Sequence, residues 1–290
     1  MGADKMSILV QKFGGTSLST ESARERVIHH IARERTAGYS VVVVVSAMGR
    51  KGEPYATDTL LGLIRDNGDS LPPRELDMLQ GCGETISAAV MCSLLRAKGI
   101  PAEALNGAGA GIVTDEQFGG ARIKHIRPDR IHRLLQEGRV VVVTGFQGMT
   151  ENGDVTTLGR GGSDTTATAL GAALQADMVD IYTDVSGILT ADPRYVKEAK
   201  QLSFVTYAEI CNMARQGAKV IHPRAVEIAQ QSRIPVRVRS TFTDDPGTLV
   251  SDTVRGAGDY TVKDRHVTGI AHAPGVTQIS VFAAESRSDL

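Results

Sequence analysis

The sequence predicts an α/β protein, a three-layer α/β/α sandwich in which helices cover both faces of a mainly parallel central sheet. Two observations predict this class. Short β-branched runs alternate with helical stretches along the 290 residues, as in parallel sheets built through crossover helices. The run 41–45 consists of five valines, which is typical of a strand that is buried on both faces. Aromatic residues make up only 4% of the chain and tryptophan is absent, so the core must be aliphatic.

The expected strands and helices follow in order along the chain. Strands are expected at 7–13, 40–46, 139–145, 178–184 and 235–239. The helices are marked by their ends. A long helix should begin at Pro72 and Pro73 and end at Gly99, and another should run between Pro128 and Gly138, following the preference for proline first and glycine last. Thr206 and Glu209 have the spacing of a capping box.

The predicted domain organisation is an α/β domain over 1–248, a linker over 249–266, and a short β-containing unit over 267–290. The linker is inferred from the glycine-rich and charged stretch 256–259. The last unit has too few residues for an independent core.

Composition excludes several classes of protein. The formal net charge is −1, so no global field would hold nucleic acid or an anionic membrane. No apolar run nears the roughly 18 residues of a membrane span, and no signal peptide precedes the first strand. Cys82, Cys92 and Cys211 form no C-x-x-C pair, which favours a reducing cytoplasm. No histidine has a metal-binding spacing, so no metal held by protein side chains is expected, and His29 and His30 are expected on a helix surface.

The first candidate ligand site is the loop 12–17. Gly14 and Gly15 follow a strand and precede a helix, so that unpaired backbone N–H groups and a positive helix end would face a ligand. Lys12 adds a point charge, and together these groups suit a phosphate. The alternative is a plain Gly-Gly turn beside a solvated lysine.

The second candidate is the loop 159–166, which leads into an alanine-rich helix. Arg160 lies among three glycines, and Arg forks onto a carboxylate in two hydrogen bonds. Ser163 or Asp164 would otherwise serve only as the helix N-cap. The two loops together indicate a phosphate donor beside a carboxylate substrate. The P-loop pattern and the eukaryotic protein-kinase motifs are both absent.

Seven motifs resemble, in order, those of the aspartokinases: VQKFGGTS (10–17), VVSAMG (44–49), GETIS (83–87), TLGRGGSD (157–164), YTDVSG (182–187), TADPR (190–194) and GAKVIHP (217–223). The match extends to Leu249. Segment 49–58 is similar to the bacterial class that diaminopimelate inhibits. The resemblance implies the amino acid kinase fold and transfer of the ATP γ-phosphoryl group to the β-carboxylate of L-aspartate. The product is 4-phospho-L-aspartate, at the first step of lysine or diaminopimelate, threonine and methionine biosynthesis.

The resemblance also implies roles for individual residues. Catalysis would depend on Lys12, Asp164 and Lys219, with Mg²⁺ as cofactor. The predicted ATP-binding residues are Lys12, Phe13, Gly14, Gly15, Tyr182, Thr183, Ile188, Leu189, Thr190, Ala191, Asp192, Pro193, Arg194 and Lys219. The predicted substrate-binding residues are Ser46, Thr57, Glu84, Arg160, Gly161, Gly162 and Ser163. Glu84 would pair with the substrate ammonium group, or else be only a first-turn acid that the helix dipole favours.

Charge alone predicts how the reaction would proceed. An aspartate side chain is already ionised at pH 7, so no general base is needed, and catalysis must overcome repulsion between a carboxylate and a triphosphate. Two rival functions stay open: a kinase for N-acetylglutamate or glutamate, and a binding subunit without activity. A scaffold protein would explain neither glycine-rich loop.

The resemblance also bears on regulation and assembly. Family members usually continue into paired ACT domains, and 268–272 and 276–281 resemble the opening of the first. The chain is too short to complete that domain, so weak feedback inhibition is expected. A homodimer is expected by resemblance.

Overall fold

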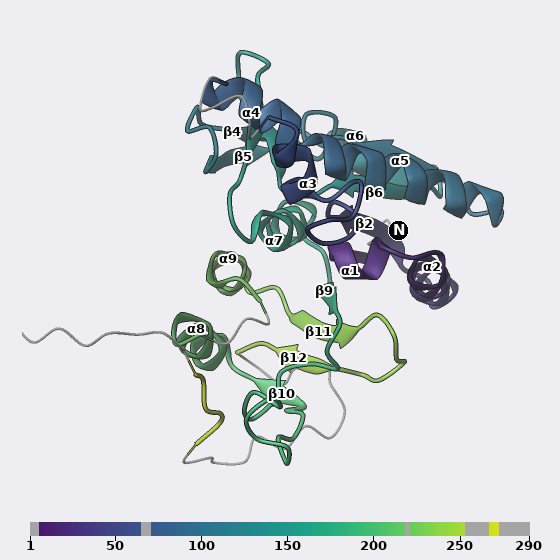
Figure 1. Ribbon diagram of the computed structural model, residues 1–290. Helices are drawn as coiled ribbons and strands as arrows, with labels where there is room; N and C mark the ends of the chain where they lie inside the picture. The colour runs from purple at the N-terminus through teal and green to yellow at the C-terminus, as the bar shows by residue number, and fades with distance from the viewer. Residues whose placement is uncertain (1–5, 65–70, 218–220, 253–266, 273–290) are drawn as a thin grey trace, which may run out of the picture.

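The computed structural model describes residues 6–64, 71–217, 221–252 and 267–272, and shows the predicted α/β architecture (Figure 1). An eight-stranded sheet runs through its centre. In spatial order its strands are β10 (Phe204–Val205), β12 (Thr248–Val250), β11 (Val236–Ser240), β9 (Met178–Thr183), β1 (Ile8–Phe13), β2 (Ser40–Val45), β6 (Val140–Thr144) and β3 (Ala102–Leu105). Only the β11–β12 pair is antiparallel among these described strands.

The valine-rich strands alternate their side chains between two cores. Val41, Val43 and Val45 face a cluster under α2 (Glu21–Thr36) and α5 (Cys82–Ala97). Val42 and Val44 face the other cluster, under α6 (Asp129–Gln136), α7 (Gly162–Leu174) and α9 (Pro223–Ser232). Helix α8 (Tyr207–Arg215) packs beside α9. A strand buried on both faces must be apolar throughout, which explains the run of five valines.

All five predicted strands are present, with ends within one or two residues of the prediction. The predicted capping box is also confirmed, because the Thr206 side chain accepts from Glu209 N while the Glu209 side chain accepts from Thr206 N. The sheet extends to Val250, two residues past the predicted boundary at 248. Most of the predicted linker and residues 273–290 lie outside the described residues.

A second sheet of four short strands was not predicted. It contains β5 (Ile123–Ile126), β4 (Ile112–Thr114), β7 (Gln147–Met149) and β8 (Val155–Thr157). Buried Asp77 ties this sheet to helix α4 (Pro73–Gln80). Its carboxylate accepts hydrogen bonds from Thr157 N and Thr157 Oγ1 at 2.7 Å and from Gly119 N at 3.0 Å.

The predicted helix between Pro73 and Gly99 is interrupted at Gly81, which separates α4 from α5. The Gln147 side-chain amide donates to the Gly81 carbonyl at this point. By length and composition alone, Pro73–Ala97 would be long and apolar enough to cross a membrane. Buried Asp77 and Glu84 lie within it and α5 packs on β3 and β6, as expected for a core helix of an α/β protein.

His30 corrects another expectation, because it is fully buried rather than on a helix surface. Its Nε2 lies 2.9 Å from the Thr241 carbonyl oxygen, and its ring lies 4.7 Å from the Tyr182 ring. Burial lowers the pKa of His30 to about 4, so the ring is neutral at pH 7.

Candidate active site

A cavity of about 370 Å³ opens at the carboxyl ends of β1 and β2, where open α/β sheets bind ligands. Ten of the predicted site residues line it: Lys12, Gly15, Ser46, Thr57, Glu84, Arg160, Gly161, Gly162, Ser163 and Asp164. They come from β1, the start of α1 (Gly15–Leu18), the segment after β2, helices α3 (Thr57–Gly62) and α5, and the loop before α7 and its first turn. The two glycine-rich loops therefore do meet at one site.

The Lys12–Asp164 ion pair joins these loops. Lys12 Nζ lies 2.8 Å from Asp164 Oδ1, and each side chain is 14% exposed. Asp164 Oδ2 lies 3.4 Å from the backbone N–H of His222, which donates to it. The lysine charge is therefore held in place at the cavity wall by an acid on the neighbouring helix.

The backbone at Gly15 approaches the loop after β2 very closely. A Cβ atom at Gly15 would lie 2.6 Å from the Gly49 carbonyl oxygen and 2.8 Å from that of Ala47. Gly15 also begins the one-turn helix α1 (Gly15–Leu18), directly after Lys12, Phe13 and Gly14. Glycine at position 15 therefore allows the loop 12–17 and the loop 46–49 to pack closely together as one wall of the cavity.

Glu84 brings a buried carboxylate to the cavity. The residue is 3% exposed, and its Oε1 accepts a hydrogen bond from Ala47 N at 3.1 Å. Its Oε2 is buried with no hydrogen-bond partner among the described residues. Desolvation raises the pKa of Glu84 to about 7. A buried oxygen without a partner at a cavity wall is poised to receive a cationic ligand group.

The 159–164 loop presents Arg160 at the cavity from a left-handed turn. Gly161 has φ +71°, and a Cβ there would lie 2.1 Å from the His222 ring. Arg160 is exposed, whereas Gly162 is buried at the start of α7. Arg160 and Glu84 both line the cavity, so its wall carries side chains of both signs of charge.

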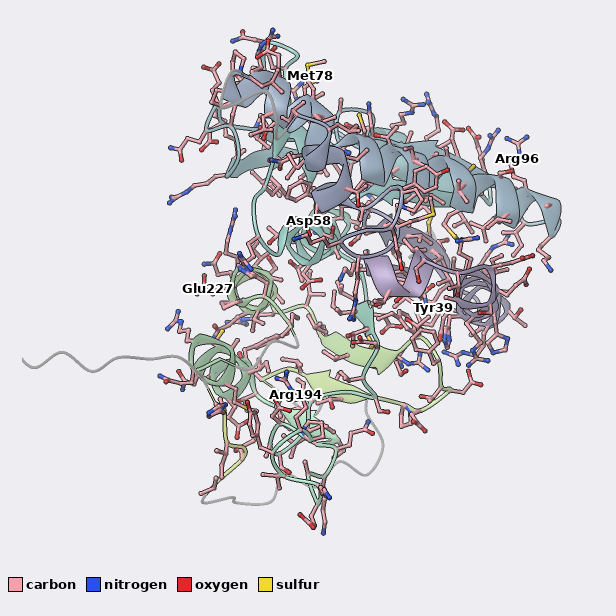
Figure 2. The ribbon with its side chains drawn as sticks, viewed as in Figure 1. Tyr39, Asp58, Met78, Arg96, Arg194 and Glu227 are labelled. Carbon is pink, nitrogen blue, oxygen red and sulfur yellow. The ribbon has the colours of Figure 1, made fainter. Side chains whose placement is uncertain are left out.

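Sequence reasoning missed several residues that line the cavity, among them Arg50, Lys51, Asp58 and Phe146. The first three lie in segment 49–58, whose charges were the available signal. Arg50 Nη2 lies 2.7 Å from Asp184 Oδ2, just after β9. Figure 2 labels Asp58 on α3, beside α7.

Other predicted ATP-binding residues do not line this cavity. The side chains of Phe13, Tyr182 and Ile188 are buried in the core, and the Phe13 and Tyr182 rings stack at 4.5 Å. They are therefore available to a ligand through their backbone alone. Gly14, Thr183 and residues 189–194 are also absent from the lining. Lys219 lies outside the described residues.

Segment 188–196 forms a separate loop near β12, in the lower half of Figure 2, where Arg194 is labelled. Asp192 accepts hydrogen bonds from Nε and Nη2 of the Arg194 guanidinium and from Arg194 N. These bonds lower the pKa of Asp192 to about 2. Within the described residues no cluster of His, Cys, Asp or Glu has the arrangement of a metal site.

The sequence was compared with known proteins. Residues 7–240 match the model of the amino acid kinase family. The chain is 55% identical over 278 residues to aspartokinase 1 of Bacillus subtilis, covering 96% of this chain and 69% of that protein. It is 46% identical over 282 residues to an aspartokinase of Geobacillus stearothermophilus, covering 97% and 66%. The chain thus spans about two thirds of the length of these relatives.

Solved structures agree with these matches. Aspartate kinase from Synechocystis superposes with a TM-score of 0.74 at 46% identity, covering 84% of this chain and 40% of that one. Aspartokinase III of E. coli, in complex with aspartate and ADP, gives 0.74 at 31% identity, covering 86% and 66%. The cavity, its two glycine-rich loops and these matches lead to one conclusion: the chain belongs to the amino acid kinase family, and within it to the aspartokinases.

Proposed function

We propose that the chain transfers the γ-phosphoryl group of ATP to the β-carboxylate of L-aspartate, giving 4-phospho-L-aspartate and ADP. The observation that carries the proposal is the charge arrangement of the cavity. Lys12 held by Asp164 lies in the same cavity as Arg160 and the unpartnered oxygen of Glu84. A related enzyme, E. coli aspartokinase III, has been solved with aspartate and ADP.

The charges on the cavity wall suit a zwitterionic amino acid. In this proposal Arg160 receives the α-carboxylate, supported by Gly161, Gly162 and Ser163, and Glu84 receives the α-ammonium. Ser46 and Thr57 line the same cavity. An N-acylated substrate would leave the Glu84 carboxylate buried and unpaired, which is costly, so N-acetylglutamate is disfavoured.

The phosphoryl group would meet Lys12 and the backbone N–H groups of Gly14 and Gly15. These donors would stabilise the charge on the transferring oxygens, which is the main contribution a protein makes to phosphoryl transfer. Lys219 is proposed to assist them, and residues 182–183 and 188–194 to hold the nucleoside. The substrate carboxylate is already the nucleophile, so the reaction needs no catalytic base.

Mg²⁺ is proposed to enter with the triphosphate. Asp164 is the carboxylate beside Lys12. It already forms an ion pair with Lys12 and accepts a hydrogen bond from the backbone N–H of His222. Mg²⁺ keeps several waters and binds through one or two carboxylates together with substrate phosphates. The ion would neutralise phosphate charge while Lys12 and the loop amides orient the transferring group.

The three cysteines remain unpaired, with Cys211 buried. Free thiols support the proposal that the enzyme works in the reducing cytoplasm. A homodimer is proposed on the family resemblance, and size-exclusion chromatography with light scattering would test it.

The purified chain should be incubated with ATP, Mg²⁺ and L-aspartate, and the acyl phosphate trapped with hydroxylamine. Hydroxamate should form with aspartate and not with N-acetylglutamate or glutamate, and Lys12→Ala should abolish it. A folded chain that binds ATP but forms no hydroxamate would contradict the proposal and favour a binding subunit.

A further inference from the structure

The segment 267–272 lies directly against the loop 188–196, although more than 70 positions separate them in sequence. Figure 1 shows it as the short yellow stretch below α8. It follows the catalytic domain, and its resemblance is to the opening of an ACT domain. In the structure, however, its contacts are with the kinase domain itself.

The contacts of segment 267–272 bracket the tetrapeptide 191–194 on both sides. Ile270 N donates to the Thr190 carbonyl oxygen at 2.8 Å. The His272 ring meets the Tyr195 ring edge-on, with centroids 4.5 Å apart. Between these two contacts lie Asp192 and Arg194, whose side chains are already bonded to each other.

The other edge of loop 188–196 is fixed by the sheet. Ile188 N donates to Thr248 Oγ1 at 2.8 Å, and Thr190 N donates to the Lys200 carbonyl at 2.9 Å. Thr190 thus directs its N–H toward Lys200 and its carbonyl toward Ile270. Segment 267–272 is therefore attached to the 188–190 and 200–202 pair by a backbone hydrogen bond at Thr190.

Segment 267–272 is itself anchored on α8. The Thr268 hydroxyl donates to Glu209 Oε1, whose other carboxylate oxygen accepts from the backbone N–H of Thr206. Gly269 passes so close to α8 that a Cβ would lie 2.7 Å from Met213 Cε and 3.3 Å from the Thr190 carbonyl oxygen. These contacts hold Ile270 and His272 at their positions on the loop.

We infer that residues 267–272 are a positioning element of the nucleotide site, which fixes both ends of the 191–194 tetrapeptide so that it can hold the nucleoside of ATP. The inference rests on the proposed function, since that assigns 188–194 to ATP. By this inference, residues that follow the catalytic domain contribute to its nucleotide site. Ile270 and His272 act through the loop and need not touch ATP.

Two matched pairs of variants in the full 290-residue chain test this. Ile270→Pro removes the N–H that Thr190 accepts, whereas Ile270→Ala keeps it and changes only a side chain that is 67% exposed. His272→Ala removes the ring beside Tyr195, whereas His272→Phe keeps a ring there. Circular dichroism and Tm establish that each variant is folded.

Loss of one hydrogen bond or ring contact should raise KM for ATP about 3- to 10-fold. Ile270→Pro and His272→Ala should show this rise with KM for aspartate unchanged. Ile270→Ala and His272→Phe should remain close to the unmodified chain. A rise shared equally by both substrates, or equal values within both pairs, would overturn the inference. If Ile270→Pro does not fold, the His272 pair decides.

Titration of ADP by calorimetry separates this inference from the proposed function. If the unmodified chain makes hydroxamate from aspartate, the KM for ATP relative to the KM for aspartate in each variant tests the inference. If it makes none but binds ADP, the proposed reaction fails, and the ADP Kd of the same pairs still decides whether 267–272 supports the nucleotide loop. Unchanged ADP affinity in Ile270→Pro and His272→Ala would then overturn it.

Discussion

At the scale of single residues, the Lys12–Asp164 pair has the clearest chemical role. Both side chains are mostly buried at the cavity wall and lie 2.8 Å apart. An amine fixed in this way costs little reorganisation when charge develops on a phosphoryl group. The ion pair would also keep the Lys12 side chain at the cavity wall, rather than extended into solvent, before ATP binds.

Replacement of Lys12 by alanine should lower kcat by roughly 10²- to 10³-fold, the range for loss of one charge-stabilising donor. The matched control is Lys98→Ala, because Lys98 pairs with Glu25 on the surface and both are about half exposed. Steady-state kinetics should leave Lys98→Ala unchanged. Equal activity of the two variants would remove Lys12 from the mechanism.

The pKa of Glu84, about 7 because of desolvation, predicts a pH dependence of substrate binding. If the ionised carboxylate receives the substrate ammonium, KM for aspartate should fall about tenfold between pH 6 and pH 8 as Glu84 loses its proton. Glu84→Gln should have a high KM that does not change over this range. Glu25→Gln is the surface control, and a pH profile in Glu84→Gln like that of the unmodified chain would contradict the assignment.

At the scale of helices and strands, Asp77 connects the small sheet to helix α4. Its carboxylate accepts from Thr157 and Gly119 with no exposed surface. The loop 158–164 follows Thr157 directly. By holding Thr157, Asp77 on helix α4 therefore helps to fix the position of Arg160. Its partners were invisible in the sequence, because they lie about 40 and 80 positions away.

Asp77→Asn should destabilise the protein by about 2–4 kcal/mol, since an amide nitrogen cannot accept the bonds that the carboxylate receives and leaves buried donors unpaired. Urea unfolding measures the change. Glu75→Gln, two positions earlier on α4 and partly exposed, should change stability by less than about 0.5 kcal/mol. A loss for Asp77→Asn as small as that of the control would show that these bonds contribute little.

Sequence patterns predicted the long buried strands and missed the short ones for a physical reason. Strands β2 and β6 consist almost wholly of valine because the sheet buries both of their faces. Strands β1 and β9 are apolar or β-branched at most positions, and β11 alternates valine with arginine. The edge strand β3 reads Ala-Glu-Ala-Leu and has no such signal. The strands of the small sheet have three or four residues and are defined by their partners rather than by their own composition.

At the scale of the whole molecule, two buried groups should oppose each other in the pH dependence of stability. His30 has its pKa lowered from 6.5 to about 4, so between these values the unfolded chain binds the extra proton and stability rises with pH. Glu84 has its pKa raised from 4.5 to about 7, so the folded chain binds the extra proton and stability falls as pH rises. The two slopes nearly cancel between pH 4.5 and 6.5.

Single variants should reveal each slope. Over pH 4.5–6.5, the free energy of unfolding should fall with rising pH in His30→Gln and rise with pH in Glu84→Gln. Each slope should approach at most about 1.4 kcal/mol per pH unit. Urea unfolding of the apo protein at four pH values measures this. Parallel curves for the two variants would contradict the opposed roles.

The candidate site was predictable where charge and glycine spacing reveal a loop's chemistry, as for Lys12, Arg160 and Asp164. Which loops meet depends on the order of strands in the sheet, and this is why Arg50 and Phe146 were missed. Tyr182 is a different case, and its role in ATP binding stays a prediction. Its motif suggested a ligand contact, but the burial of its ring between Phe13 and His30 is a property of the packed molecule.

The place of β1 in the sheet has a consequence for biosynthesis. β1 leaves the ribosome before the other described strands, yet its two neighbours are β2, at 40–45, and β9, at 178–183. The strands β1, β2, β3 and β6 can assemble once about 144 residues exist, while the other edge of β1 stays open until β9 emerges. At roughly 5–20 residues per second this wait lasts several seconds. A nascent chain of this enzyme therefore exposes the unpaired edge of β1, the strand that contains Lys12. A ribosome-associated chaperone would be expected to bind there.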